Sequence, residues 1–256
     1  MGWFGFGRKK KASEAESQPS KAETRREEVP EATEASLDDW DEELRDMMAD
    51  QNPEDDEEFD ERLVQASFNA GELLFEIEEY EEAAEHLFEA AACGHARAQY
   101  YLGEMANNGW GVPENEIVAA EWYGQAAAQG DTDAMYALGL LYDTGSELSR
   151  DSREAARWYR LAADRNHAGA WHALGGMYRI GTIGEDADEQ KALECWRKAG
   201  ELGHMVAQND LGDHFRDAGN TVESARWFRM AAAQGSDYAR RALWEMGLPY
   251  MEDQKE

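Results

Sequence analysis

The feature that most constrains the fold of this chain is a short motif that recurs along most of its length. In this motif a small residue is followed five positions later by glycine. It occurs at Ala66/Gly71, Ala98/Gly103, Ala134/Gly139, Ala170/Gly175 and Ala207/Gly212. A sixth register begins at Ala239, where Trp244 replaces the glycine. Successive units are 32 to 37 residues apart, and a period of this length predicts an array of stacked helical units.

Each unit predicts two antiparallel helices. The first helix contains the motif glycine, with leucine just before it in most units. The second helix contains a bulky pair at Trp122-Tyr123, Trp158-Tyr159, Cys195-Trp196 and Trp227-Phe228, and a small pair four residues later. Large side chains facing small ones allow the helices to interdigitate. Glycine costs a helix about 1 kcal/mol relative to alanine, so its recurrence predicts close helix–helix approach.

Residues 134–142, Ala-Met-Tyr-Ala-Leu-Gly-Leu-Leu-Tyr, followed by Ala155-Ala156-Arg157-Trp158-Tyr159 and Ala162-Ala163, resemble a Sel1-like repeat. This is the longer-looped relative of the tetratricopeptide repeat. The loop Gly109-Trp110-Gly111-Val112 matches the Gly-x-Gly-Val signature of the family. The first unit, with a tight turn at 78–81, and the last full unit are more similar to plain tetratricopeptide repeats.

The resemblance implies an all-α fold, a right-handed superhelical solenoid of antiparallel helix pairs over residues 63–248, with a tail at 249–256. It also implies an extended concave face that binds proteins. In tetratricopeptide repeats this groove is lined by first-helix positions three before, one after and four after the glycine. Carried onto this chain, these positions are Tyr100, Glu104, Asn107, Tyr136, Leu140, Asp143, His172, Gly176, Arg179, Asn209, Asp213 and Arg216. Such side chains suit an extended peptide or a helix of a partner; the alternative is that some of them only face solvent or pack locally.

Residues 12–62 differ in composition from the repeats. Acidic residues outnumber basic ones there by about four to one, and apolar side chains are few, which predicts a disordered acidic linker. Within it Leu37, Trp40, Leu44 and Met47 share one face of a possible short helix over 36–48. This helix either folds on a partner or docks on the repeats of its own chain, and the sequence does not separate the two.

The first eleven residues form a third segment, in which three aromatic residues precede a basic cluster. The residues concerned are Trp3, Phe4, Phe6, Arg8, Lys9, Lys10 and Lys11. Rings of this kind enter the headgroup boundary and the cations meet lipid phosphates, so the segment predicts weak contact with an anionic membrane surface. It is similar to the aromatic-basic start of the bacterial signal-recognition-particle receptor. The alternative is a frayed terminus.

The sequence offers no constellation that predicts catalysis, a metal site or a cofactor. His95, His167 and His204 share one repeat position that Asp131 and Ser236 occupy elsewhere, which indicates a role at helix starts. The carboxylate run at 54–58 lacks the glycine of a calcium-binding loop. Cys93 and Cys195 form no pattern, and they are interpreted as small buried residues.

Two functions follow from these observations. The first is a non-enzymatic cytoplasmic adaptor that grips a partner protein in the groove and is held at the inner membrane surface by its first eleven residues. The second is an acidic chaperone-like or inhibitory protein that binds basic clients by charge. The formal charge of −30 argues against nucleic acid as a partner in either case. The chain also lacks the cysteine pair that each repeat of secreted Sel1-like proteins carries, which favours an intracellular location.

Overall fold

The computed structural model describes residues 61–145, 149–182 and 186–248. Within these ranges the chain forms eleven α-helices and no strand. The helices are α3 (Glu61–Glu76), α4 (Tyr80–Ala92), α5 (Ala96–Asn108), α6 (Glu116–Ala128), α7 (Thr132–Thr144), α8 (Ser152–Ala163), α9 (Ala168–Ile180), α10 (Glu189–Glu201), α11 (Met205–Asp217), α12 (Thr221–Ala233) and α13 (Asp237–Glu245). The predicted segments at 1–11 and 36–48, nearly all of the linker, and the tail at 249–256 lie outside the described residues.

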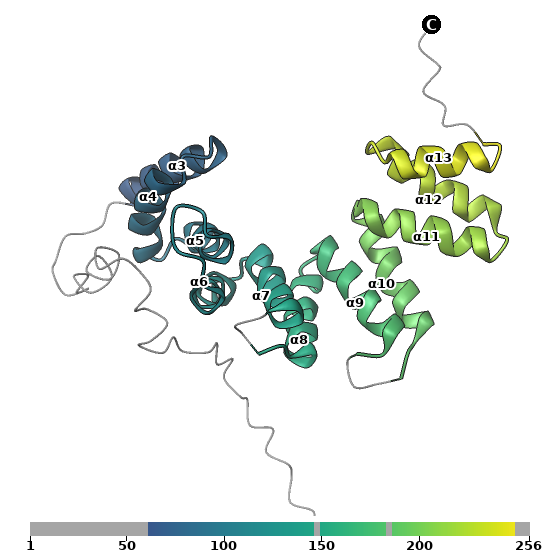
Figure 1. The fold of residues 1–256 in the computed structure, drawn as a ribbon, viewed down its shortest axis with the longest axis horizontal. Helices are drawn as coiled ribbons and strands as arrows, with labels where there is room; N and C mark the ends of the chain where they lie inside the picture. Colours follow the sequence, from purple (N-terminus) through teal and green to yellow (C-terminus); the bar gives the residue numbers. More distant parts are fainter. Residues whose placement is uncertain (1–60, 146–148, 183–185, 249–256) are drawn as a thin grey trace, which may run out of the picture.

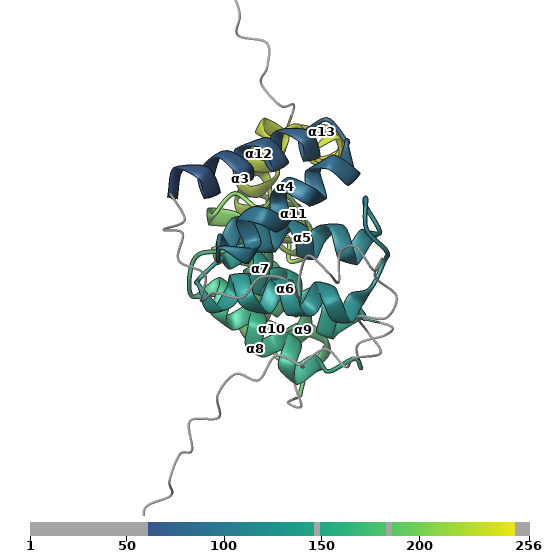
Figure 2. The ribbon, with the colours of Figure 1, turned by 90° about the vertical axis from the view of Figure 1, so that its left-hand side faces the viewer.

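The helices pack in sequence order, each against its neighbours along the chain. Figure 1 shows the resulting arch, with α3–α5 in one arm and α11–α13 in the other. The first helices of the central units, α5, α7 and α9, face the hollow of the arch, and α6 and α8 lie on its outside (Figure 1). Viewed from one end, the successive helix pairs stack behind one another (Figure 2). The predicted all-α solenoid of antiparallel helix pairs is confirmed.

The motif glycines mark the points where the two helices of a unit approach each other most closely. A Cβ atom placed on any of the five would overlap a side chain of the second helix. The side chains concerned are Leu87 opposite Gly71, Tyr123 opposite Gly103, Tyr159 opposite Gly139, Trp196 opposite Gly175 and Phe228 opposite Gly212. Four of these partners are the second members of the bulky pairs, and Leu87 holds the equivalent position in the first unit. The predicted reason for the glycines, close helix–helix approach, is therefore confirmed.

The first members of the bulky pairs join one unit to the next. The Trp122 ring lies edge-on to Phe88, 6.0 Å between centroids, and so connects α6 to α4. Trp227 of α12 packs on Gly200 of α10, whose added Cβ would lie 2.8 Å from the indole. Trp122, Trp158 and Trp227 are all buried. The core therefore consists of alternating contacts within units and between units, as expected for a solenoid.

The loop after α5 explains the Gly-x-Gly-Val signature. Gly109 ends the helix with φ of +68°, and Gly111 has the same value, a left-handed conformation that glycine adopts without strain. Gly111 also lies directly against the backbone of Tyr80. Between the glycines, Trp110 stacks on the Tyr80 ring with centroids 5.4 Å apart. The longer loop thus covers the turn of the preceding unit.

The boundaries differ slightly from those expected. Glu61 and Arg62, the first described residues, are already helical, so the first helix includes the two residues before the predicted start of the repeats. The turn of the first unit lies at 77–79 rather than 78–81, because Tyr80 already begins α4. Glu78 there has φ of +66°, a left-handed turn in a residue other than glycine.

Two adjacent glycines of α9 allow two effects of an added methyl group on stability to be measured separately. These effects are steric overlap and helix propensity. Gly175→Ala should lower the free energy of unfolding by about 1–3 kcal/mol, because the new Cβ overlaps the Trp196 indole. Gly176→Ala should raise it by about 0.5–1 kcal/mol, because nothing lies within 4 Å of that Cβ and alanine favours the helix. Thermal and urea unfolding of both variants check the prediction. Equal effects of the two substitutions would contradict it.

Candidate protein-binding face

The candidate face is built on the starts of the first helices. The residues that cap α5, α7, α9, α11 and α13 are His95, Asp131, His167, His204 and Ser236. Each accepts a hydrogen bond from the backbone N–H of the motif alanine three residues later, over 2.8–3.2 Å. The histidines do so through Nδ1. The predicted helix-start role of this repeat position is confirmed.

The same capping residues contact the preceding unit. The His95 ring stacks on Phe68 at 4.2 Å, His167 on Tyr136 at 4.5 Å, and His204 on His172 at 4.6 Å between centroids. Phe68, Tyr136 and His172 all lie three residues before a motif glycine. This is the first of the three predicted groove positions. Its side chains therefore help to join consecutive units in addition to lining the face.

The two remaining junctions use polar contacts at the same place. At one of them the Ser236 hydroxyl donates to Oδ1 of Asn209 over 3.2 Å. At the other, Arg97 lies over the Tyr100 ring at 4.3 Å and pairs with Asp133 at 2.6 Å and Asp131 at 3.5 Å. The guanidinium of Arg97 thus spans the junction at which the capping residue, Asp131, has no aromatic ring. Different residues perform one structural task at equivalent positions.

Burial sets the protonation state of the capping histidines. It lowers the pKa of His95, of His167 and of His204 below the ordinary value. Asp133, 3.3 Å from His167, opposes the effect of burial on the pKa of that ring without overcoming it. A neutral ring leaves Nδ1 free to accept the capping hydrogen bond, so the pKa shift and the cap act in the same direction.

The second groove position, one residue after the glycine, carries two carboxylates that are already hydrogen-bonded. Glu104 accepts from the Tyr123 hydroxyl over 2.6 Å, and Asp213 accepts from the Tyr238 hydroxyl over the same distance. Burial raises the pKa of Tyr123, with a further rise from the Glu104 carboxylate, so the phenol stays a donor. In the unit of Gly139 the same position is held by Leu140, which is 39% exposed.

The third groove position, four residues after the glycine, is mostly charged. Asp143 pairs with Arg150 at 3.7 Å, and Arg216 pairs with Asp213 at 2.5 Å. Arg179 is exposed and lies over the Trp196 ring at 5.1 Å. Asn107 is half-buried. None of the predicted groove residues is buried. Their role in binding a partner stays a prediction.

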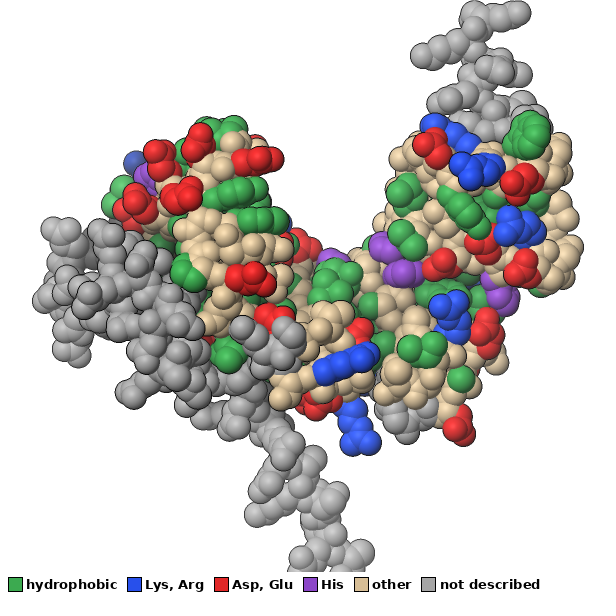
Figure 3. Space-filling model, in the orientation of Figure 1, with side chains coloured by type: hydrophobic (Ala, Val, Ile, Leu, Met, Phe, Trp, Pro, Cys, Tyr) green, Lys and Arg blue, Asp and Glu red, His purple; other side chains and the backbone are tan. Residues whose placement is uncertain are grey.

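The hollow of the arch shows how these groups are distributed over the surface. In Figure 3 acidic side chains dominate the arm formed by α3–α5, whereas the arm formed by α11–α13 mixes acidic and basic ones. Histidines and apolar side chains lie at the base between the arms (Figure 3). Along this face His172 binds Asp210 of the next unit through Nε2, 2.8 Å away. The face offers polar, aromatic and charged groups in turn, without one dominant chemistry.

Sequence reasoning missed a buried amide contact in two units. The side-chain amides of Gln99 and Gln208 donate to the carbonyls of Ala91 and Gly200 in the preceding unit. The carbonyl of each amide accepts from a glutamine that ends the next helix, Gln129 or Gln234, over 2.8 Å. The signal was present, since these units alone end the second helix in Ala-Ala-Ala-Gln-Gly.

The described residues contain no group of three or more His, Cys, Asp or Glu side chains that could hold a metal ion. None of the described helices is long and apolar enough to span a bilayer. Cys195 is buried and Cys93 half-buried, and both are free thiols. The predicted membrane contacts Trp3 to Lys11 lie outside the described residues.

A family model described as Sel1 repeat matches residues 96–131, 132–167, 170–204 and 206–236. The last match corrects the expectation that the last full unit is a plain tetratricopeptide repeat. A solved Sel1 repeat protein from Oxalobacter formigenes is 34% identical over 72% of this chain and 76% of its own, with a TM-score of 0.60. A comparison with curated proteins gave no match.

Two further solved structures share the fold. One is c5321, a protective antigen of uropathogenic Escherichia coli strains that displays an SLR fold. It is 24% identical over 73% of this chain and 43% of its own, with a TM-score of 0.64. The other is the immunity protein Pa5087 from Pseudomonas aeruginosa, 18% identical over 69% and 68% of the two chains, with a TM-score of 0.50. At these identities the likeness concerns the fold alone.

The capping histidines predict a pH dependence of stability. Their pKa is lowered in the folded chain, so the unfolded chain binds more protons below its own histidine pKa of about 6.5. Their stabilising contribution is therefore complete above that pH and decreases as the pH falls below it. Melting temperatures between pH 7.5 and 5.5 check this. Replacing His95, His167 and His204 by Asn, which caps helices without titrating, should flatten the profile; an unchanged slope would contradict the assignment.

Proposed function

Because the chain belongs to the Sel1 repeat family, we propose that it is a non-enzymatic adaptor that holds a peptide or helix of a partner protein against the first-helix face of α5, α7, α9 and α11. Sel1 repeat proteins generally act as protein–protein interaction scaffolds and are typically not enzymes. A stack of helix pairs exposes such a face over several units, which suits an extended ligand.

The observation that carries this proposal is the pair of exposed groups on that face. Leu140 and Arg179 lie on α7 and α9, one and four residues after their motif glycines, and both are exposed. An apolar side chain and a guanidinium on neighbouring units supply both contact area and directional hydrogen bonds. Tyr136 and His172 lie beside them, fixed by their stacked histidines. A rigid face of this kind loses little side-chain entropy when it binds.

The alternative, an acidic protein that binds basic clients by charge, rests on the formal charge of −30. Several carboxylates of the face are already paired, among them Asp213 with Arg216 and Asp133 with Arg97. This pairing favours binding by shape and specific contacts over binding by net charge. The two readings differ in their salt dependence, because charge-led affinity falls steeply with ionic strength.

We further propose that the chain works in the cytoplasm, at the inner surface of a membrane, through its first eleven residues. The support is compositional: three aromatic rings precede four basic residues. Each cation contributes about 1 kcal/mol near an anionic surface, so contact through this segment is weak and reversible. The adaptor would thus present its partner close to the membrane.

The groove can be tested with peptides that are selected from a random library for binding to the full chain. Leu140→Glu and Arg179→Glu should each weaken the selected peptides at least tenfold, or about 1.4 kcal/mol, by adding charge and removing a contact. Val222→Glu is the matched control, since Val222 is also exposed but lies on α12. Titration calorimetry at two salt concentrations gives the affinities. Equal losses of affinity in all three variants would refute the groove. A loss of affinity that follows the salt concentration and not the substitutions would also refute it.

Vesicle sedimentation tests the membrane contact. The full chain should bind vesicles of anionic phosphatidylglycerol and be released as salt rises, because the lipid charge is then screened. A variant with Trp3, Phe4 and Phe6 changed to alanine should bind several-fold less, and neutral phosphatidylcholine vesicles should not bind either chain. Equal sedimentation of the variant and the parent would exclude the aromatic contact.

A further inference from the structure

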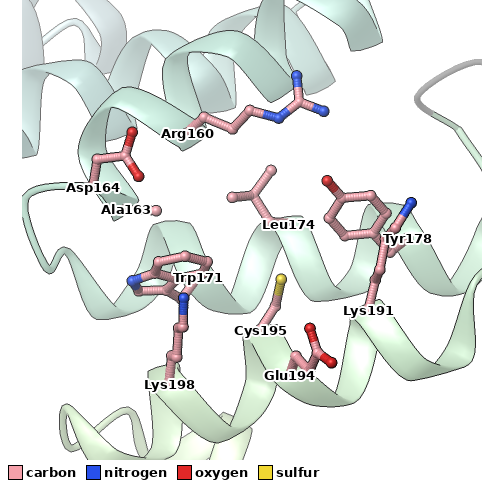
Figure 4. A pocket seen from close by; sticks show the side chains of 10 residues that line it. All are labelled: Arg160, Ala163, Asp164, Trp171, Leu174, Tyr178, Lys191, Glu194, Cys195 and Lys198. Carbon is pink, nitrogen blue, oxygen red and sulfur yellow. The ribbon is translucent and has the colours of Figure 1, made fainter.

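A cavity of about 340 Å³ lies among α8, α9 and α10. Trp171, Leu174 and Tyr178 of α9 line it, with Ala163 of α8 and Cys195 of α10. The Cys195 sulfur points into the space, and both basic and acidic side chains lie around it (Figure 4). A space of this size accommodates a large side chain of a ligand.

The cavity exists because one unit departs from the repeat pattern. The first member of the bulky pair is tryptophan in the neighbouring units, at Trp158 before it and Trp227 after it, but here it is Cys195. Both tryptophans are buried, and Trp227 packs on the unit before its own. Cysteine is much smaller, so the space that an indole would fill is left open.

Equivalent contacts in the next unit confirm this register. There the Trp227 ring packs on Gly200, the second member of the small pair in the preceding unit. The residues equivalent to Trp227 and Gly200 one unit earlier are Cys195 and Ala163, and both line the cavity. The cavity therefore lies at the position that the Trp227 indole occupies in the next unit.

The rim of the cavity is unusual for so acidic a chain. Lys191, Lys198 and Arg160 line it, and Lys191 and Lys198 are the two lysines of the described part of the chain. Lys198 lies 4.0 Å from the centre of the Trp171 ring, and Lys191 lies 5.4 Å from that of Tyr178. Asp164 and Glu194 are the acidic residues among them. An aromatic side chain flanked by carboxylates would suit this site.

This site lies on a different face from the groove. Residues on a helix are about 100° apart, so Trp171, Leu174 and Tyr178 share one side of α9, and His172 and Arg179 share another. A ligand in the cavity therefore leaves the proposed groove open. The cavity needs its own occupant, and the sequence contains a segment with the required chemistry.

We propose that this cavity binds the 36–48 segment of the same chain, with the indole of Trp40 in the space that Cys195 leaves open. Trp40 follows Asp38 and Asp39 and precedes Asp41, Glu42 and Glu43. An indole between two acidic runs matches a cavity whose rim carries three basic side chains, one of them Lys191 paired with Asp188 at 3.5 Å, against two acidic ones. Leu37 and Leu44, on the same face of the predicted helix, extend the apolar contact. The segment lies outside the described residues, so its sequence carries this match.

The connecting chain is long enough for this contact within one molecule. From Trp40 to Glu61, the first described residue of α3, the chain can span about 70 Å when fully extended and about 55 Å when residues 41–48 are helical. Packed helices lie about 8–10 Å apart, so the five helix spacings from α3 to α8, which forms one wall of the cavity, cover about 40–50 Å. The connecting chain is therefore long enough to reach the cavity from its α8 side.

The alkylation rate of the Cys195 thiol indicates whether the cavity is occupied, since this thiol forms part of the cavity wall. In a full chain that carries Cys93→Ser, Cys195 is the remaining thiol. Its alkylation by iodoacetamide, followed by intact mass, should be at least fivefold faster after Trp40→Ala, because the indole no longer covers it. Trp3→Ala is the matched control and should leave the rate unchanged. An excess of a synthetic 36–48 peptide should slow the reaction of the Trp40→Ala chain.

A substitution in the cavity wall provides a second test of the site. Cys195→Trp restores the repeat pattern and should fill the cavity from within. A fluorescent 36–48 peptide should bind the full Trp40→Ala chain but not the chain that carries both substitutions. Binding should weaken as salt rises and after Lys191→Gln and Lys198→Gln. A melting temperature equal to or above that of the parent would show that Cys195→Trp folds.

Several results would overturn the proposal. They are equal alkylation rates with and without Trp40, an equal effect of Trp3→Ala, and peptide binding that survives Cys195→Trp. Protection of Cys195 that grows with protein concentration would assign the site to a second copy instead of the same chain. Leu140→Glu, which alters the groove, should not change the alkylation rate, so failure here and failure of the groove are distinguishable.

Discussion

The close contact between a glycine of the first helix and a bulky side chain of the second is the interaction on which the rest of the structure depends. It brings the two backbones of a unit near enough for one ring to fill the space between them. Only then can the adjacent tryptophan point away, toward the preceding unit, as Trp122 does toward Phe88. Contacts within a unit and contacts between units therefore come from two consecutive residues, and the stack follows from them.

The face that is proposed to bind partners is also where consecutive units are joined. Tyr136 and His172 stack on the caps of the next helices, and Tyr100 is held beneath Arg97. These contacts hold the side chains in place before any ligand arrives, which lowers the entropic cost of binding. They also mean that removing such a ring would damage the solenoid. Leu140 and Arg179 contribute less to these contacts between units, so their substitution is a better test of partner binding.

The unit that carries Cys195 in place of tryptophan is informative for the same reason. Where Cys195 replaces tryptophan, a neighbouring helix still stacks, but a space opens between α8 and α10. At the equivalent positions Trp122 and Trp227 the indole packs on the preceding unit instead. A second binding surface can therefore arise from a single small residue in an otherwise complete array, on a face separate from the groove.

The sequence by itself determined the helix pairs, their order and the close approach at each glycine, because these are local patterns repeated five times. It also indicated that His95, His167 and His204 begin helices, since residues that cap helices share their position. Only the tertiary structure decided that their rings stack on the preceding unit and that Gln99 and Gln208 bind across it. It alone placed the cavity beside Cys195. Such contacts join residues from different units, and their geometry depends on how one unit rotates on the next, which no local pattern encodes.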